Sequence, residues 1–309
     1  GSLAILLLVP AFTVLAAFSK ENGVLAPALC AVLEFVYWRP KNSGRRPMAV
    51  RLFFWLLVIV PITAGLFLLL LYPEFFLAGY SNRPFSLSQR LMTQPRVLFD
   101  YLASILLPAG ASFSILRDDY AISRSLVAPV TTLFSVLGWA AITGAALAMR
   151  RRAPSFTAGI GLFLVGHAIE SSIFPLLIYF EHRNYFPSVG ILLAIASLIV
   201  WLLSGIRAHL SNPALILRTG TVSLLIVLSF ASFARASTWS STERLVQQTV
   251  EAYPDSRHGR MELAKLELEK PFPDFAKAKR QVIHLKTLER PSTRMIGGIM
   301  EVLILCRES

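Results

Sequence analysis

Long apolar runs alternate with short polar segments through the first three quarters of the chain. Seven of these runs are long enough, or nearly so, to form a helix that crosses about 30 Å of hydrocarbon with about 20 residues. The second run is short and contains Pro27, and the last is marginal in length and rich in serine. The pattern predicts an all-α fold in which residues 1–235 form a polytopic bundle of about seven membrane-spanning helices. The predicted spans are approximately residues 2–19, 23–38, 52–72, 128–149, 156–180, 186–204 and 219–234.

Residues 73–127 form the longest interval between two predicted spans. Residues 95–107 within it are apolar, but Arg96 and Asp100 interrupt this short run. A span there would move the basic run 150–152 to the outer side, against the rule that short loops rich in Lys and Arg are cytoplasmic. We therefore expect residues 95–107 to form an interfacial or re-entrant helix on the outer surface.

Clusters of basic residues follow the second, fourth and sixth predicted spans. With seven spans all three clusters fall on one side, which should be cytoplasmic. The opposite side then carries residues 20–22, 73–127 and 181–188, together with everything after Arg235. The clusters are Arg39, Lys41, Arg45, Arg46 and Arg51, then Arg150, Arg151 and Arg152, then Arg207 and Arg218.

The pattern changes after Arg235, because residues 236–309 are polar, charged and amphipathic. Pro254-Asp255-Ser256 predicts the start of a helix with Asp255 or Ser256 as the N-cap. The prolines at 271 and 273 end this helix, and Pro291-Ser292 begins another. The expected apolar faces consist of Leu263, Ala264 and Leu266, followed by Phe275, Ala276, Ala278, Val282 and Leu285.

The helix starts at Pro254 and Pro291 indicate a repeat. Their spacing fits a helix–turn–helix unit of about 34 residues with a small insertion. Residues 236–309 therefore resemble a tetratricopeptide repeat (TPR) in a soluble C-terminal helical domain, and an ordinary helical hairpin is the alternative. A TPR array needs about three repeats, so we expect the chain to continue beyond residue 309.

The composition supports a membrane protein. Hydrophobic residues make up 55% of the chain and charged residues 16%, while the net charge is +12. The basic residues lie beside apolar segments and form no stripe with interleaved aromatics, which argues against a nucleic-acid partner. Cys30 and Cys306 are far apart and imply neither a disulfide framework nor a metal site. The chain opens in an apolar run without Met or a basic region, so we expect residue 1 not to be the natural start.

Two polar segments near predicted spans are candidates for chemistry. Charge at membrane depth is expensive, so ionisable residues there usually face a cavity, a partner or a substrate path. His167 and Glu170 are three residues apart, which would place them on one face of the predicted fifth helix. His182 and Arg183 could bind a phosphate, with Glu181 orienting Arg183. The alternatives are a buried polar pair that ties helices together and a loop held by its own charges.

Two further groups lie on the predicted outer side. Lys20 beside Glu21 could hold a lipid phosphate as a point charge, or the two could simply pair in a solvated turn. Asp118 and Asp119 could act as a general base or hold a divalent cation, although adjacent acids also occur in ordinary solvated loops. The predicted polar track consists of His167, Glu170, Asp118 and Asp119, and no motif with metal-ligand spacing is present.

Three stretches together resemble a known family. The chain is similar to the later part of the multi-spanning GT-C glycosyltransferases that carry C-terminal TPRs, in particular the transmembrane and TPR-containing O-mannosyltransferases and their bacterial counterparts. Order and spacing agree from Ser19 to Pro291. The stretches are Ser19-Lys20-Glu21-Asn22 with Glu34; Phe85-Ser86-Leu87, Arg90-Leu91, Arg96-Val97-Leu98, Leu106-Leu107-Pro108, Asp119-Tyr120 and Ser123-Arg124-Ser125; and Glu181, Arg183, Tyr185, Pro187, Ser188 and Gly190.

The resemblance implies transfer of a sugar from a polyprenyl-phosphate carrier to an acceptor on the outer face of the membrane. It places the catalytic acid in an outward loop before residue 1, and it implies that Lys20 and Arg183, with His182 or Arg124, neutralise the carrier phosphate. The variants Asn184 and Phe186 favour the bacterial members, and hence an inner-membrane protein with its C-terminal domain in the periplasm. The expected partners are membrane lipids, the lipid-linked sugar and a protein or acceptor at the TPR-like domain.

A second class of function is compatible with the same sequence. The chain could be a membrane-anchored scaffold whose outer helical domain recruits a partner as a subunit of a larger complex. A transporter is disfavoured because no inverted repeat is visible. An outward loop with Asp or Glu upstream of residue 1 would favour the enzyme over the scaffold.

Overall fold

The computed structural model describes residues 2–38, 47–106, 117–206, 212–288 and 291–308. Within these ranges the chain is helical and has no strand beyond an isolated bridge between Ser125 and Ala128. The all-α class is therefore confirmed for this part of the chain. Four of its helices are long and apolar enough to cross a membrane: Met48–Leu71, Thr131–Met149, Glu181–Gly205 and Ala214–Trp239.

The chain forms two compact units. The first contains Gly1–Leu102, Ser123–Leu176 and His182–Ser211, and the second contains Ala103–Ile122, Leu177–Glu181 and Asn212–Ser309. The helix Pro213–Trp239, which contains the last predicted span, thus groups with the C-terminal helices, together with two short segments from earlier in the chain.

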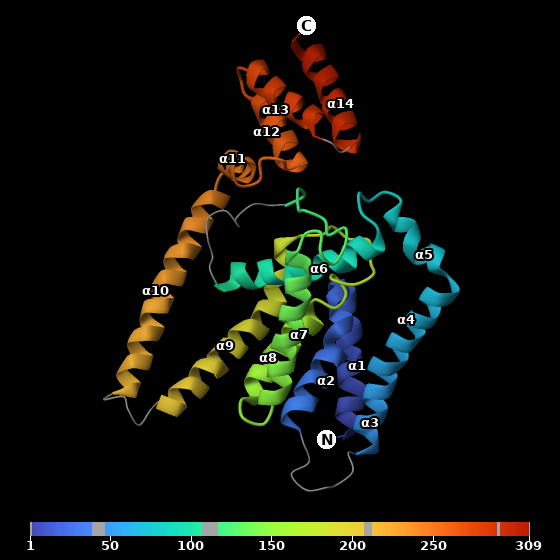
Figure 1. The fold of residues 1–309 in the computed structure, drawn as a ribbon, viewed down its shortest axis with the longest axis vertical. Coiled ribbons are helices and arrows are strands. Elements are labelled where there is room, and N and C mark those ends of the chain that lie inside the picture. Colours follow the sequence, from blue (N-terminus) through green and yellow to red (C-terminus); the bar gives the residue numbers. More distant parts are fainter. Residues whose placement is uncertain (1, 39–46, 107–116, 207–211, 289–290, 309) are drawn as a thin grey trace. The chain divides into compact units, whose positions relative to one another are not determined.

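Most helices of the first unit run along a common direction, and one crosses them (Figure 1). The helix Met48–Leu71 is continuous but contains one π-helical turn, η2. The elements are α1 (Ser2–Ser19), η1 (Glu21–Leu25), α2 (Ala26–Tyr37), α3 (Met48–Phe54), η2 (Trp55–Ile59), α4 (Val60–Leu71), α5 (Pro73–Leu77), η3 (Ala78–Tyr80), α6 (Leu87–Leu106), α7 (Thr131–Met149), α8 (Pro154–Gly166), η5 (Glu181–Asn184) and α9 (Tyr185–Ile206).

Helix α8 is the centre of the first unit and packs against α2, α7 and α9. A Cβ atom added at Gly159 would lie 2.3 Å from the carbonyl oxygen of Gly190, so only glycine permits this approach of α8 and α9. A Cβ atom at Gly161 would lie 2.7 Å from Cγ1 of Val32 on α2. Small residues at helix crossings are the usual way in which membrane helices gain packing contacts.

Long-range hydrogen bonds define the two ends of the first unit. At one end, Asn22 before α2 donates to Glu170 after α8. At the other end, Tyr37 donates to Ser155 at the start of α8, and Arg150 lies over the Phe35 ring with its carbon Cζ 3.5 Å from the ring centroid. Helices α2 and α8 are therefore antiparallel. We call the end with Glu170 the polar end and the end with Arg150 the basic end.

Two of the seven predicted spans are wrong in extent. The predicted span 156–180 is helical only as far as Gly166, and residues 167–180 form turns and irregular backbone. The run 23–38 divides into the 3-10 helix η1 and the 12-residue helix α2, which is about 18 Å long at 1.5 Å per residue. Apolar composition continues through both breaks, so hydropathy alone does not reveal them.

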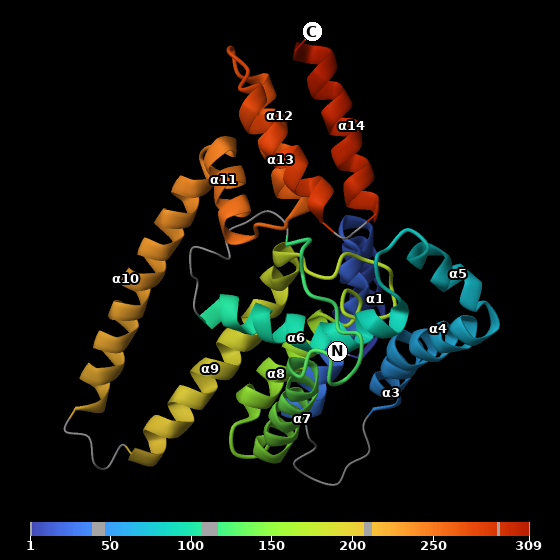
Figure 2. The ribbon, with the colours of Figure 1, turned by 45° about the horizontal axis from the view of Figure 1, so that its top comes forward.

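Helix α6 has 20 residues and begins at Leu87, eight residues before the start expected from the sequence. It is amphipathic and does not belong to the long apolar helices. Its buried face includes Thr93, Val97 and Tyr101. Figures 1 and 2 show its first part, in the first unit, running across α7, α8 and α9. Its predicted position at the membrane interface stays a prediction.

The second unit is a succession of helices in which each of the last four packs on its neighbour. Ser256 is the N-cap of α12, and its hydroxyl accepts from the amide of Gly259 at 3.0 Å. The core consists of Ala264, Leu268, Ala278, Val282, Met300 and Ile304. The elements are α10 (Pro213–Trp239), α11 (Thr242–Ala252), α12 (Arg257–Glu269), α13 (Phe275–Thr287) and α14 (Pro291–Glu308).

The predicted apolar faces of the second unit are correct with one exception. Ala264, Ala278 and Val282 are buried, whereas Leu263 and Leu266 are half-buried. Ala276 is exposed and does not belong to the core. It lies two residues before Ala278, about 200° away around the helix at 3.6 residues per turn, so both cannot face the same neighbour.

Candidate functional site

Three segments that are far apart in the sequence meet at the polar end of the first unit. The amide Nδ2 of Asn22 donates to Oε1 of Glu170 at 2.7 Å. Oε2 of Glu170 lies 3.1 Å from Nε of Arg183, and these two side chains are 5% and 10% exposed. Because a buried charge is stable only when it is paired and hydrogen-bonded, this ion pair fixes η1, the segment after α8, and η5 relative to one another.

Two further basic residues, Lys20 and His182, belong to the same neighbourhood. His182 lies within electrostatic range of Lys20, Arg183, Glu21 and Glu170. Lys20 and Glu21 are exposed, whereas Glu170 is buried. The structure thus brings together five of the site residues predicted from the sequence, namely Lys20, Glu21, Glu170, His182 and Arg183. The positive charges of Lys20 and Arg183 lie beside the buried carboxylate of Glu170 and the exposed carboxylate of Glu21. We call Lys20, Asn22, Glu170, His182 and Arg183 the polar cluster.

A tight turn after α1 positions the first segment of the polar cluster. The amide of Lys20 donates to the oxygen of Ala16, and the amide of Gly23 donates to the oxygen of Lys20, both at 2.8 Å. A Cβ atom at Gly23 would lie 2.2 Å from the carbonyl carbon of Ala16. Glycine is therefore required where η1 folds back on α1, and this fold directs Asn22 towards Glu170.

The irregular segment 170–176 is held by a buried arginine from α6. Arg90 is 0% exposed and donates to the oxygens of Ser172 at 3.1 Å, Leu176 at 2.5 Å and Glu170. Burial lowers the pKa of Arg90 to about 10, so the guanidinium stays charged at neutral pH. Carbonyl groups outside regular helices need such donors. Sequence reasoning assigned no role to Arg90, and its only signal was a place in the motif Arg90-Leu91.

His167 and Glu170 do not share a helix face, because α8 ends at Gly166. His167 is the C-cap, and its Nδ1 is 3.0 Å from the oxygen of Phe163. A carbonyl only accepts, so Nδ1 carries the proton and Nε2 is an acceptor. The ring stacks on Tyr101 with centroids 5.3 Å apart. The predicted helical pair is therefore a C-cap and a loop carboxylate.

Glu181 does not have the role expected from the sequence. Its carboxylate pairs with Arg235 of α10 at 3.3 Å within the second unit. The carboxylate that pairs with Arg183 in the described contacts is Glu170, 13 positions earlier in the chain. Sequence proximity favoured Glu181 as the partner of Arg183, whereas the described ion pair of Arg183 is with Glu170.

Four buried acceptors of the first unit have no hydrogen-bond partner within the described part of the chain. They are Nε2 of His167, the Oδ1 atoms of Asn22 and Asn184, and Oε2 of Glu170, which lies in the ion pair with Arg183. The Nδ2 atom of Asn184 donates to the oxygen of Tyr101 at 3.0 Å, which fixes its amide. Since buried polar atoms are nearly always satisfied by protein, water or ligand, these atoms offer acceptors for hydroxyl groups near the polar cluster.

Asp118 and Asp119 belong to the second unit and have structural contacts there. Asp118 accepts from the hydroxyl of Ser256 at 2.7 Å and from the amide of His258 at 3.1 Å. A carboxylate at this position stabilises the N-terminus of α12. Burial raises the pKa of the Asp119 carboxyl above its usual value. In the described part of the chain, no group of three or more His, Cys, Asp or Glu residues could hold a metal ion.

Arg124 lies in the loop that precedes α7. Its side chain is exposed, and its amide donates to the oxygen of Ala128 at 2.8 Å. The residue before it, Ser123, is fully buried, and its hydroxyl shares a hydrogen bond of 2.7 Å with the hydroxyl of Thr132. The described contacts of Arg124 are thus with its own loop rather than with the polar cluster.

Comparison with known proteins gives no relative for this chain. No protein-family model, curated protein or solved structure matches it. The resemblance seen in the sequence is therefore a hypothesis, and the function is inferred from the charges and contacts of the polar cluster.

Proposed function

We propose that this chain is part of an integral-membrane glycosyltransferase of the GT-C type, which takes a sugar from a polyprenyl-phosphate carrier. The observation that supports the proposal is the convergence of Lys20, His182 and Arg183 at one end of an apolar helical unit. A lipid phosphate is an anion that such a basic pocket between membrane helices binds well. Glu170 pairs with Arg183, and the exposed ammonium of Lys20 supplies a second positive charge for the ligand.

The proposed reaction assigns the polar cluster to the leaving group. A base removes the proton of the acceptor hydroxyl, the hydroxyl oxygen bonds to the sugar C1, and the bond from C1 to the carrier phosphate breaks. Negative charge then grows on the departing phosphate, where Arg183 and Lys20 stabilise it. The family resemblance assigns the base to a carboxylate outside residues 1–309, so the residues described here bind and stabilise rather than deprotonate.

The proposal includes orientation. The polar cluster would lie at the outer face, and the basic end with Arg150 would lie in the cytoplasm. The second unit would then carry a TPR-like domain outside, in a periplasm if the protein is bacterial. Helices α11–α14 support this part because successive helices pack on one another through small buried residues such as Ala264 and Ala278.

The exposed face of α14 favours a second function, that of an assembly subunit. Met295, Ile299, Val302 and Leu303 lie at positions i, i+4, i+7 and i+8, and each is more than half exposed. Such spacing places four apolar side chains on one side of the helix. A further helical repeat or a partner protein would cover this face, and the scaffold function needs no catalytic carboxylate.

Binding of a carrier phosphate tests the first function. Purified protein in nanodiscs is titrated with a short-chain prenyl monophosphate, and with inorganic phosphate as a head-group control. We expect Arg183→Ala to weaken binding of the prenyl phosphate strongly, because the substitution removes one of the two full cations of the polar cluster. Arg51→Ala is the matched control, since Arg51 is an exposed arginine of α3 and lies outside the polar cluster.

Transfer activity in the full-length protein completes the test. Arg183→Ala should abolish sugar transfer while the protein still inserts into the membrane, and Arg51→Ala should keep both properties. Normal binding and transfer by Arg183→Ala would contradict the proposal and leave Arg183 as a structural partner of Glu170. The assembly function would then be the better explanation.

A further inference from the structure

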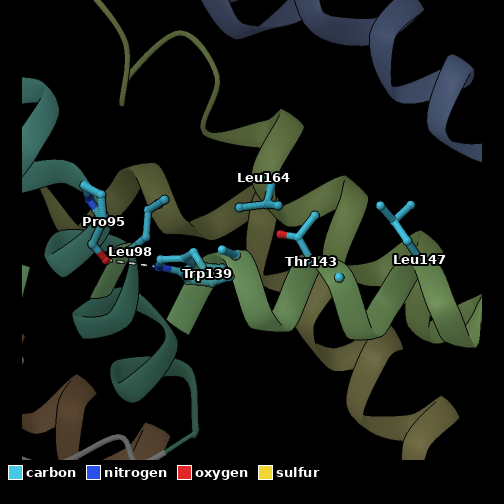
Figure 3. Close-up of a pocket in the computed structure, with 8 residues that line it drawn as sticks. Pro95, Leu98, Trp139, Thr143, Leu147 and Leu164 are labelled. Atoms are coloured by element: carbon cyan, nitrogen blue, oxygen red, sulfur yellow. Dashed lines mark hydrogen bonds between the residues drawn. The ribbon is translucent and has the colours of Figure 1, made fainter. Parts of the chain in front are cut away.

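The first unit carries an apolar groove beside α7 that the proposed function does not use. Its volume is about 520 Å³ (Figure 3). Pro95 and Leu98 line it from α6, Leu164 lines it from α8, and Trp139, Thr143 and Leu147 line it from α7. Among these six residues, Thr143 alone has a polar side-chain oxygen, so the groove suits an apolar ligand.

The length of the groove matches one leaflet of a bilayer. The lining residues of α7 extend from Trp139 to Leu147, which is about 12 Å at 1.5 Å per residue. Half of a hydrocarbon core of about 30 Å is about 15 Å. Figure 3 shows these residues in a row along the α7 axis, with Pro95 at the Trp139 end. A chain in the groove would run along α7, as the tails of lipids run across a leaflet.

Helix α6 closes one end of the groove and excludes a spanning helix as its occupant. The indole nitrogen of Trp139 donates to the oxygen of Pro95 at 3.0 Å, which fixes α6 against α7 at this level. A membrane helix needs about 30 Å of contact length and an axis about 8–10 Å from α7. A helix packed beside α7 would collide with α6 at the level of Trp139. A single hydrocarbon chain is thinner and shorter, and it fits along α7 between Trp139 and Leu147.

Charge at the closed end is suited to a phosphate. Arg96 follows Pro95, and its guanidinium donates to the hydroxyl of Ser123 at 3.2 Å. Arg124, the next residue after Ser123, is exposed. Arg96 thus adjoins Pro95 at the α6 end of the groove and contacts the loop that carries Arg124. The head group of a lipid would lie at this end when its tail follows α7.

We propose that this groove binds one acyl chain of an anionic bilayer phospholipid, with its head group at the α6 end. The site differs from the polar cluster. Trp139 stacks on Phe163 with centroids 5.4 Å apart, and Phe163 contacts His167 edge-on at 4.6 Å. Since Phe163 is 0% exposed, this aromatic row separates the groove from the cluster, and the proposal does not depend on glycosyl transfer.

Fluorescence of Trp139 tests the site directly. Trp139 is only 8% exposed, so bulk lipid should quench it poorly unless a chain occupies the groove. The protein is reconstituted into phosphatidylglycerol that is brominated on its acyl chains, since bromine quenches tryptophan at contact. The background variant keeps Trp139 as its one tryptophan and carries Trp38→Phe, Trp55→Phe, Trp201→Phe and Trp239→Phe.

Filling the groove should remove the quenching. A Cβ atom at Gly144 meets nothing within 4 Å, and Gly144 lines the groove. Gly144→Leu therefore adds a side chain to the groove without a backbone clash. The matched control is Gly65→Leu, because Gly65 of α4 is equally open and lies outside the groove. If Gly144→Leu does not fold, Ala140→Leu fills the groove from the preceding turn.

The proposal predicts strong quenching of Trp139, loss of most of it in Gly144→Leu or Ala140→Leu, and no change in Gly65→Leu. Absence of quenching would mean that protein covers the groove, and would overturn the proposal. Quenching that persists in both filled variants would equally contradict it. If a few mole per cent of unbrominated long-chain prenyl phosphate abolishes the quenching, the occupant is an isoprenoid chain instead.

Discussion

The polar cluster and helices α12–α14, which we call the C-terminal hairpins, use ion pairs in opposite ways. Glu170 and Arg183 are 5% and 10% exposed and come from separate elements. The pairs Lys265–Glu262 and Lys277–Asp274 each lie within three residues of one another, and all four side chains are at least 32% exposed. The residue types are nearly the same, but burial and sequence separation differ.

The difference shows that burial decides whether an ion pair determines how segments of the chain are arranged. A buried pair must satisfy both partners, because an unpaired charge in an apolar region costs several kcal/mol. An exposed pair is screened by water and contributes about 0–1 kcal/mol. Glu170 and Arg183 therefore specify one arrangement of three segments, whereas the pairs on α12 and α13 mainly keep the surface soluble.

The largest effect should follow the loss of one buried partner. We expect Glu170→Ala to lower the free energy of unfolding by about 3–5 kcal/mol, because Arg183 is left buried without its carboxylate and Asn22 loses its acceptor. Denaturant unfolding of the reconstituted protein measures the change. Replacing both partners with leucine should recover much of the loss, since an apolar pair leaves no unpaired charge.

A long-range but exposed ion pair separates burial from sequence distance. Lys270 lies 3.5 Å from Glu243, and these side chains are 35% and 52% exposed. We expect Glu243→Ala to cost less than about 1 kcal/mol. If Glu170→Ala and Glu243→Ala cost the same, burial is not what distinguishes the two regions, and the comparison fails.

The second-largest effect should come from the packing of the hairpins. Ala278 of α13 is 0% exposed and belongs to the core with Ala264 and Val282. Ala278→Leu should destabilise the second unit by about 1–3 kcal/mol, because close-packed cores resist added volume. Ala276→Leu is the control on the exposed side of the same helix. Equal melting temperatures for the two variants would contradict the assigned core.

Sequence patterns predicted the start and end of α12 and the start of α14 well because their signals are local. The resemblance to a TPR stays a prediction. Helix α12 ends shortly before Pro271, helix α14 begins at Pro291, and Ser256 is the N-cap of α12. Each of these effects acts within a few residues of the chain. Asp255 was an equal N-cap candidate, and the sequence could not choose between neighbours that both have acceptor side chains.

The site was harder to predict because its contacts are long-range. The largely apolar run after Gly166 continues to Phe180, so hydropathy indicated one helix. In the structure the carbonyls of Glu170, Ser172 and Leu176 accept hydrogen bonds from Arg90 of α6. Lys20 and Arg183 were predicted as site residues from their type and their place near the ends of predicted spans. Proximity in sequence favoured Glu181 as the partner of Arg183, and it could not indicate the ion pair with Glu170, which comes from a different segment.

A capping hydroxyl should have an intermediate effect. Ser256→Ala should cost about 1 kcal/mol, with a range of about 0.5–2, because the Ser256 hydroxyl accepts from Gly259 and donates to Asp118. Thermal unfolding checks the value. Ser241 caps α11 with a longer bond of 3.4 Å to the amide of Arg244, so Ser241→Ala should cost less. If Ser241→Ala lowers the free energy of unfolding more than Ser256→Ala does, the lengths of the two capping hydrogen bonds do not determine which substitution costs more.

The smallest effect should follow the removal of an exposed pair. The Nζ atom of Lys265 lies 2.7 Å from Oε1 of Glu262, three residues earlier on α12. Pairs of this kind stabilise a helix by about 0.2–0.5 kcal/mol, and alanine is itself the best helix former. Lys265→Ala should therefore change the free energy of unfolding by less than about 0.5 kcal/mol. At 1 M salt, where the screening length is about 3 Å, even this difference should disappear. A loss above about 1.5 kcal/mol that persists at high salt would mean that Lys265 has a packing role through its aliphatic stem, and exposed charge on the hairpins would then also carry structural information.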